Sequence, residues 1–398
     1  MLIEIVIALL IGVAIGVITG ILPGIHINLI GSLLLSSTLS IIFNINPIYL
    51  VVFIVSMSIT HIFIDFIPSI YLGAPDDSSI LSVLPGHKML LQGKAHEAVT
   101  ITLFGCLISI IVVIFLAPIL IFSLPELNEI VTPFISFILI ILSTILIFKE
   151  KYKISALIIF LLAGFLGLAT LNLPIKEPLL PLLTGLFGSS SLILTIKQKT
   201  QIPKQKITTI KQIKLKNNLP NLLISTLLSC LIGFLPSIGA SQIATFSSII
   251  KKQSSKQFLF SLGLISSLTM VLSFITVFTI NKSRTGSAVF IQQLLNEISL
   301  NQIIFILIIS LLTGILSFIL GIKISKFFAN NIQKFNYTKI SIFVLVFLTA
   351  IVFLISGILG LIVFTTSTFL GIFCNLSEVR RTNLMASLIL PTIILYLF

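Results

Sequence analysis

Long stretches without a charged residue dominate this chain. No Asp, Glu, Lys or Arg occurs between Ile5 and Ile64, and similar tracts recur along the 398 residues. Only 9% of the residues are charged while 57% are hydrophobic, which is too little charge to cover a soluble protein of this length. Because a helix needs about 20 apolar residues to cross a bilayer, the tracts predict an all-α polytopic membrane protein with about a dozen spans plus shorter hydrophobic arms.

Basic residues gather in a few short loops. The segment 197–216 carries seven lysines and no acid. Since Lys and Arg mark the cytoplasmic loops of membrane proteins, we thread the spans alternately from an N-terminus outside the cell membrane. This path puts 21 of the 24 basic residues on the cytoplasmic side. The net charge of +13 therefore indicates an orientation in the membrane, and we expect no nucleic-acid partner.

Two apolar tracts contain the same kind of break. GILPGIHINLI starts at Gly20 and GFLPSIGASQI starts at Gly233, and they share five of eleven positions, including Gly-x-Leu-Pro. The same offset of 213 residues places Gly73 opposite Gly286. We interpret these matches as an internal duplication. The basic loops of the two copies fall on opposite sides of the membrane, which predicts inverted-topology repeats, a feature typical of secondary transporters.

The duplication divides the chain into five expected parts. Both transport repeats would hold broken or re-entrant helices, with the binding site near the bilayer midplane. The parts are the first transport repeat (1–97), intervening transmembrane helices (98–196), a basic cytoplasmic loop (197–218), the second transport repeat (219–321) and C-terminal transmembrane helices (322–398).

The breaks are the predicted substrate-binding site. A proline that ends one half-helix and starts another exposes N–H groups, and such a positive helix end binds anions. Irregular backbone at membrane depth also needs surrounding protein or a water-filled cavity. The alternative is a simple kink at which small residues allow close helix packing. The predicted substrate-binding residues are Pro23, Gly24, His26, Asn28, Gly73, Pro236, Ser237, Gly239, Ser241, Gln242, Arg284, Gly286 and Ser287.

Ionisable residues near these breaks suggest roles in binding and coupling. Arg284 can clamp a carboxylate with its guanidinium, or else snorkel to the outer interface. Acids at membrane depth bind a cation or take up a proton; alternatively, Asp76 and Asp77 cap a short helix and Asp65 lies at the interface. The candidate coupling-ion residues are Asp65, Asp76, Asp77 and Ser78.

Na⁺ or H⁺ is therefore the expected coupling ion, and we expect no cofactor. The four histidines and three cysteines show no metal-ligand spacing. His87 and His96 belong to a basic loop and are expected to be solvated.

Four blocks of the sequence resemble a known family. They are GILPGIHINLIGSLLLS, LGAPDDSSILSVLPGHKMLLQGKAHEAV, GFLPSIGASQIATFSS and a C-terminal segment with EVRRTNLM. In this order they resemble the large membrane subunit of the tripartite tricarboxylate transporters, including its archaeal relatives. The resemblance implies an integral-membrane permease for carboxylates that is driven by an ion gradient. It also implies, as partners, a small membrane subunit and an extracytoplasmic binding protein.

Two other classes of membrane protein are alternatives to a carrier. A channel would be expected to show a repeated filter or a ring of charges, whereas the duplication favours alternating access by one chain. A membrane-embedded enzyme or scaffold that acts on lipid is the second alternative. No Gly-x-Ser-x-Gly, His-Glu-x-x-His or P-loop motif occurs, so we expect no enzymatic activity.

The breaks generate a direct prediction. Replacing Pro23-Gly24 or Pro236-Ser237 with Ala-Leu should abolish uptake of the anion without preventing membrane insertion, because a continuous helix no longer exposes its N–H groups. Uptake into cells and the amount of protein in the membrane fraction are measured together. Uptake that survives both changes would show that the breaks are not the binding site.

Overall fold

The computed structural model describes residues 2–22, 46–73, 83–197, 202–208, 218–232, 239–295, 297–332 and 337–397. In these parts all regular structure is helical and no strand is present, which confirms the predicted all-α membrane fold. Some predicted site residues lie outside the described residues: Pro23, Gly24, His26, Asn28, Asp76, Asp77, Ser78, Pro236 and Ser237.

Fewer helices span a bilayer than the apolar tracts suggested. Seven helices of the described residues are long and apolar enough, and one of these, Ala95–Phe148, covers 54 residues and holds two successive helices. Five further apolar helices have only 10 to 17 residues. At 1.5 Å per residue the shortest of these cannot cross about 30 Å of hydrocarbon. The described residues thus hold seven candidate spans, and the shorter apolar helices fit the hydrophobic arms that were expected beside the spans.

Two helices form the centre of the molecule. In α3 (Pro47–Leu72) and α12 (Ser255–Ile280), 89% and 94% of the membrane-spanning window is buried. Around them pack α1 (Leu2–Ile21), α5 (Ala95–Val131) and α14 (Leu300–Asn331). The short helices of this central group are α4 (Val83–Leu91), α10 (Leu219–Ile232), α11 (Ala240–Ile250) and α13 (Gly286–Leu295).

Local sequence sets the ends of both central helices. Asn46 accepts a hydrogen bond from the Ile48 N–H, and Ser254 accepts one from Gln257 N–H, as N-cap residues do. At the other end, Gly73 and Asn281 take the left-handed conformation that closes a helix. Both helices therefore contain 26 residues between equivalent caps.

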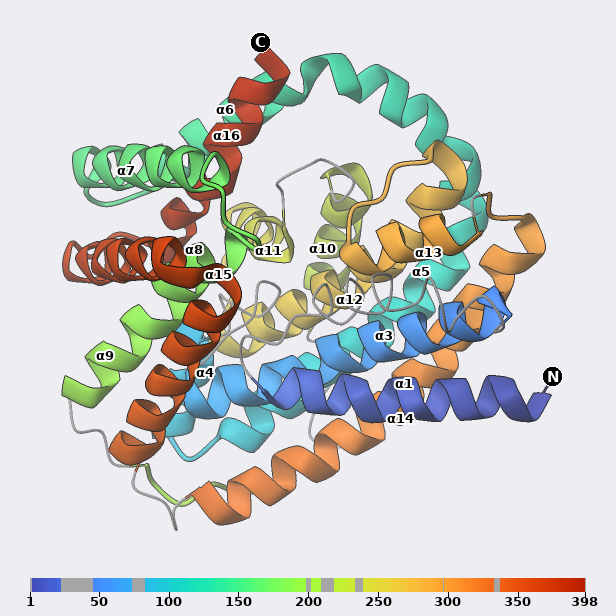
Figure 1. Cartoon of the computed structure of the whole chain (residues 1–398), viewed down its shortest axis with the longest axis horizontal. Helices are drawn as coiled ribbons and strands as arrows, with labels where there is room; N and C mark the ends of the chain where they lie inside the picture. The colour runs from blue at the N-terminus through green and yellow to red at the C-terminus, as the bar shows by residue number, and fades with distance from the viewer. Residues whose placement is uncertain are drawn as a thin grey trace.

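The ends of α3 and α12 match at a different sequence offset from that of the motifs. The starts of α3 and α12, Pro47 and Ser255, differ by 208 positions, not by the 213 of the sequence motifs. By this spacing the left-handed C-caps of the two helices, Gly73 and Asn281, are the matching positions. The two helices also run in opposite directions, since α3 ends on the left beside α4 and α12 ends on the right beside α13 (Figure 1).

Glycines bring the outer helices close to the centre. A Cβ on Gly263 of α12 would lie 2.2 Å from the Thr102 carbonyl oxygen, and one on Gly105 of α5 would lie 2.3 Å from the Phe260 carbonyl oxygen. Small residues at such crossings allow backbones to touch, which is how helices associate strongly in lipid.

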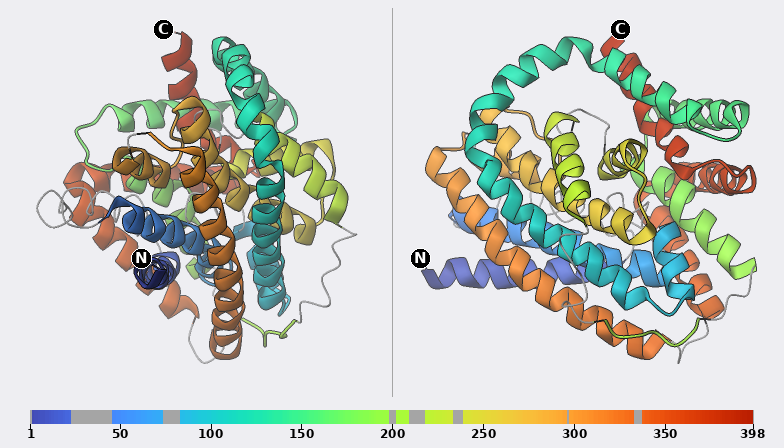
Figure 2. Two further views of the ribbon diagram at one scale, coloured as in Figure 1. Left: turned by 90° about the vertical axis from the view of Figure 1, so that its right-hand side faces the viewer. Right: turned by 180° about the vertical axis from the view of Figure 1, so that it is seen from behind.

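A second group of helices lies beside the central one, on the left in Figure 1 and on the right in the reverse view of Figure 2. The long helix α5 leads into it through η3 (Thr132–Phe134) and α6 (Ile135–Phe148). The remaining members are α7 (Lys153–Leu171), α8 (Leu179–Leu183), the π-helix η4 (Thr184–Ser189), α9 (Ser190–Lys197), α15 (Tyr337–Leu376), η8 (Arg381–Met385) and α16 (Ala386–Leu397).

The close crossing of α5 and α12 predicts a sensitive position. Gly263→Val should lower the unfolding temperature by several degrees, because overpacking a tight contact costs about 1–3 kcal/mol or more. Far-UV circular dichroism follows unfolding, and a thiol-reactive dye provides a second signal because Cys106 and Cys374 are buried. The matched control is Ala350→Leu on the exposed face of α15. Equal effects of the two changes would contradict the packing argument.

Candidate functional site

Polar side chains line the two central helices. Because α3 and α12 are enclosed by other helices, these groups face protein and not lipid, where an unsatisfied polar group is costly. On α3 the buried polar residues are Ser56, Ser58, Thr60, His61, Asp65 and Ser69. On α12 they are Ser261, Ser266, Ser267, Thr269, Ser273 and Thr276.

The first turn of α13 is docked against both central helices. Thr285 Oγ1 and Ser273 Oγ of α12 lie 2.8 Å apart, and Ser287 Oγ and Ser58 Oγ of α3 lie 2.5 Å apart. Ser58 is the twelfth of the 26 residues of α3. The positive end of a ten-residue helix therefore lies half-way along a buried spanning helix.

Arg284 turns inward next to this helix end. Its side chain is partly buried, and its Nη1 atom is fully buried without a hydrogen-bond partner in the described residues. A guanidinium is charged at neutral pH. A buried cation without a partner is costly, so an anion bound at this position would be strongly favoured.

Lys282, two residues earlier, shows the contrasting behaviour. Its side chain is exposed, and Nζ donates to Asn128 Oδ1 at 2.9 Å and to Thr132 Oγ1 at 3.4 Å. Lys282 thus extends to the surface, as the alternative interpretation expected of Arg284. The buried Nη1 of Arg284 does not reach the surface.

A second helix end carries predicted residues. Gly239 precedes α11, and its N–H donates to Gln242 Oε1 at 2.8 Å. Ser241 Oγ lies in the first turn, is completely buried and has no hydrogen-bond partner in the described residues. The start of α11 therefore offers both a positive helix end and a free hydroxyl.

Other predicted residues lie apart from these helix ends. Gly73 closes α3 by donating its N–H to Pro68 O, fifteen residues from Ser58 and hence about 22 Å along the helix. Gly73 and Gly286, paired by the sequence offset, are therefore not brought together. Asp65 is only 1% exposed and lies near Cys106 of α5, so its side chain is enclosed by protein.

His96 corrects the expectation that the basic-loop histidines are solvated. Its side chain is 1% exposed, and Nδ1 lies 2.9 Å from Ser325 Oγ of α14, which also contacts the Tyr71 hydroxyl at 3.2 Å. His87 is partly buried as well, and burial lowers its pKa. The sequence signal was available, because His96 lies on the same helical face as the buried Val99 and Leu103.

The irregular segment 202–208 is bonded to the turn between α4 and α5. Gln205 Oε1 accepts from the Ala95 N–H at 2.9 Å and its Nε2 donates to Leu90 O at 3.0 Å. The Lys206 N–H donates to Gly93 O at 2.8 Å. This part of the predicted basic loop is therefore docked onto the turn between α4 and α5.

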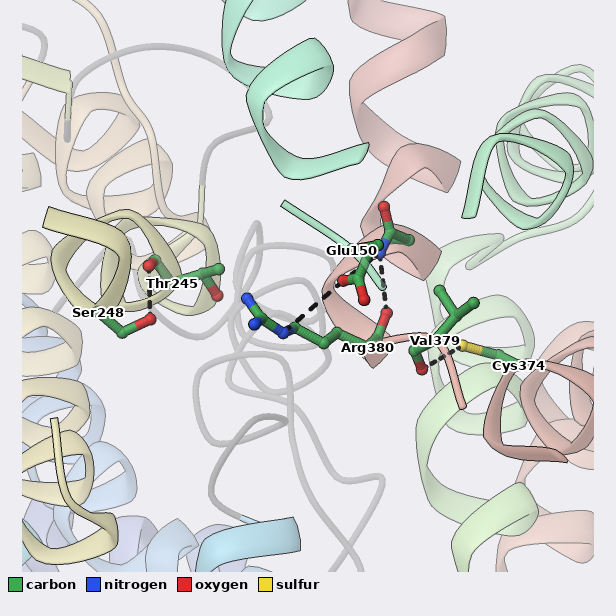
Figure 3. A network of polar contacts seen from close by, with 7 residues as sticks. Glu150, Thr245, Ser248, Cys374, Val379 and Arg380 are labelled. Carbon is green, nitrogen blue, oxygen red and sulfur yellow. Dashed lines mark hydrogen bonds and ion pairs between the residues drawn. The ribbon is translucent and has the colours of Figure 1, made fainter. Parts of the chain in front are cut away.

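A charged cluster near η8 was not predicted as part of the site. Glu150 is 7% exposed, accepts from Asn383 Nδ2 at 3.0 Å and lies 3.8 Å from Arg380 Nε (Figure 3). Arg381 is also buried and donates to Ser191 Oγ and to Asn375 Oδ1. The sequence offered two hints of this cluster: Glu150 is an acid inside a basic loop, and Arg380 and Arg381 are adjacent. Nothing in the sequence indicated that these segments meet.

Apolar outer helices surround two buried helices that carry polar side chains. This arrangement defines a multi-pass membrane protein with polar groups in its interior. The profile of the Tripartite tricarboxylate transporter TctA family matches residues 6–386, and the chain belongs to that family of membrane transporters. The uncharacterized protein MJ1079 of Methanocaldococcus jannaschii is 33% identical over 360 residues, which cover 87% of this chain and 88% of that protein. No solved structure gives a significant match.

The cluster at Glu150 predicts a pH dependence of stability. Burial raises the pKa of Glu150 above its ordinary value near 4.5, and this outweighs the opposite effect of Arg380. The folded state then binds a proton more tightly than the unfolded state. The contribution of Glu150 to the free energy of unfolding is therefore full below a pH of about 4.5 and is lost as the pH rises through the raised pKa. The unfolding temperature of the wild type should therefore fall relative to Glu150→Gln over that window.

The Gln variant is a suitable reference because it keeps an oxygen that accepts from Asn383. Melting curves of both proteins are recorded at a series of pH values. A wild type that gains stability relative to the variant as pH rises would show that the Arg380 ion pair dominates over burial.

Proposed function

We propose that this protein is an ion-gradient-driven secondary transporter of organic anions, with carboxylates as the substrate class. The observation that carries the proposal is the buried Nη1 of Arg284, which has no partner in the described residues. A guanidinium binds a carboxylate through two parallel charge-assisted hydrogen bonds. The family membership is consistent with this substrate class.

The surroundings of Arg284 suit a small carboxylate. The first-turn N–H groups of α13 add positive potential, and the Ser287 and Ser58 hydroxyls lie beside them. A substrate carboxylate would neutralise the buried charge and receive hydrogen bonds that water otherwise supplies. Ser241 and Gln242 at the start of α11 would serve a second polar group of the substrate.

The arrangement of helices supports alternating access. Each central helix packs against the short and the long helix of the other half: α3 against α13 and α14, and α12 against α4 and α5. An inverted repeat would produce this reciprocal packing together with the opposite directions of α3 and α12 (Figure 1). Two halves that can exchange their conformations give the site access to either side in turn.

Asp65 is the coupling residue that we propose among the described residues. It is the nineteenth residue of α3, and Ser273, the nineteenth residue of α12, contacts Thr285 beside Arg284. Na⁺ or H⁺ at an interior carboxylate would be bound and released with the substrate. A small membrane subunit and an extracytoplasmic binding protein are the proposed partners, since the family name describes tripartite systems.

Ligand-dependent stability tests this function. Mono-, di- and tricarboxylates are added to the purified protein with and without Na⁺ and across pH, and melting is followed by the thiol-reactive dye, since the chain has no Trp. A substrate that binds the folded state raises the unfolding temperature by mass action. Arg284→Gln should abolish this shift, because losing a desolvated charge pair weakens binding by about 30-fold or more.

The same variant provides its own control for folding. Without ligand, Arg284→Gln should be at least as stable as the wild type, because it removes a buried charge that has no partner. Lys282→Gln is the matched variant and should keep the full carboxylate shift, since Lys282 is exposed. A wild type that responds to no carboxylate, or an Arg284→Gln protein that responds normally, would refute the proposal.

A further inference from the structure

One face of α11 carries a row of hydroxyl groups. Ser241, Thr245 and Ser248 are four and three residues apart, so they lie on the same side of the helix over about 10 Å. Thr245 Oγ1 donates to Ser241 O at 3.0 Å, and Ser248 Oγ donates to Thr245 O at 2.7 Å. Hydroxyls that bond only their own helix can rotate to donate to another acceptor. The row leads from the start of α11 to the exposed Lys251 that ends it.

Arg380 faces this row from the second group of helices. η8 contacts α11, and Figure 3 shows the Arg380 guanidinium extending toward the part of α11 that bears Thr245 and Ser248. Its Nε lies 3.8 Å from Glu150 Oε1, and the Arg380 side chain is 56% exposed. That separation is an ion pair without a hydrogen bond. The guanidinium donors therefore have no hydrogen-bond acceptor among the described residues.

The cluster behind Arg380 fixes its position. Asn383 Nδ2 donates both to Glu150 Oε1 at 3.0 Å and to Arg380 O at 3.1 Å, so side chain and backbone are tied to one buried carboxylate. Arg381 bonds to the neutral groups Ser191 Oγ and Asn375 Oδ1. Two arginines thus accompany one acid, and of these the Arg380 guanidinium faces α11 (Figure 3).

We infer that Arg380 is a second anion-binding residue of the transport path. A carboxylate that leaves the start of α11 would be held between the Arg380 guanidinium and the hydroxyls of Thr245 and Ser248. This inference rests on the proposed carboxylate transport. It adds a specificity-determining residue on the side of the protein where α11 ends and where η8 meets the loop at Glu150.

The test uses the protein in liposomes of known orientation. The probe is whichever of acetate, succinate and citrate stabilises the wild type most, and KM is measured for its uptake from each side. Arg380→Gln should raise KM by about fivefold or more from the η8 side and leave it unchanged from the opposite side, as expected for loss of a charge-assisted hydrogen bond. Arg380→Lys should give an intermediate KM, since it keeps the charge but loses the planar fork.

Lys251→Gln is the matched control, because it removes an exposed positive charge at the end of the same helix. Its KM should equal that of the wild type from both sides. An unchanged KM in Arg380→Gln, or an equal increase in Lys251→Gln, overturns the inference and leaves the proposed transport intact. A wild type that neither binds nor takes up any of the three carboxylates overturns both. Retention of the carboxylate-dependent thermal shift in Arg380→Gln shows that the variant is folded.

Discussion

The cost of leaving a polar group unsatisfied in hydrocarbon governs this structure. α3 and α12 carry a dozen buried polar side chains between them, and the ionisable Asp65 and His61 of α3 would be costly against lipid. The other helices of the central group enclose them, and the glycines at the α5–α12 crossing let backbones approach without space for a side chain. Enclosure by protein is the condition that permits helix ends and charges inside the bundle.

That enclosure explains why Arg284 and Lys282 differ so strongly. Both precede α13, yet Lys282 bonds Asn128 in an exposed position, whereas the Nη1 atom of Arg284 is buried. A helix end docked at Ser58 brings partial positive charge to the middle of a buried helix. An unpaired guanidinium beside it makes the region electropositive, which is the environment that the proposed carboxylate substrate needs.

Several features could be predicted from residue patterns, and others could not. Tract length and charge frequency were sufficient for the membrane class, and block order was sufficient for the family. Tract length alone did not separate full spans from short helices, since five apolar helices of the described residues have only 10 to 17 residues. The helix starts of α3 and α12 differ by 208 positions and the sequence motifs by 213, and only the structure showed where these two helices begin and end.

By itself, the sequence determined that this chain is a helical membrane protein of a transporter family, because hydropathy and motif order are properties of the linear chain. It also singled out Arg284 as a candidate carboxylate-binding residue. Only the tertiary structure decided that Nη1 of Arg284 is buried without a partner in the described residues, that His96 and Asp65 are interior residues, and that Glu150 meets Arg380 across more than two hundred residues. The reason is physical: burial and pairing depend on which distant helices pack together, and no local pattern encodes that choice.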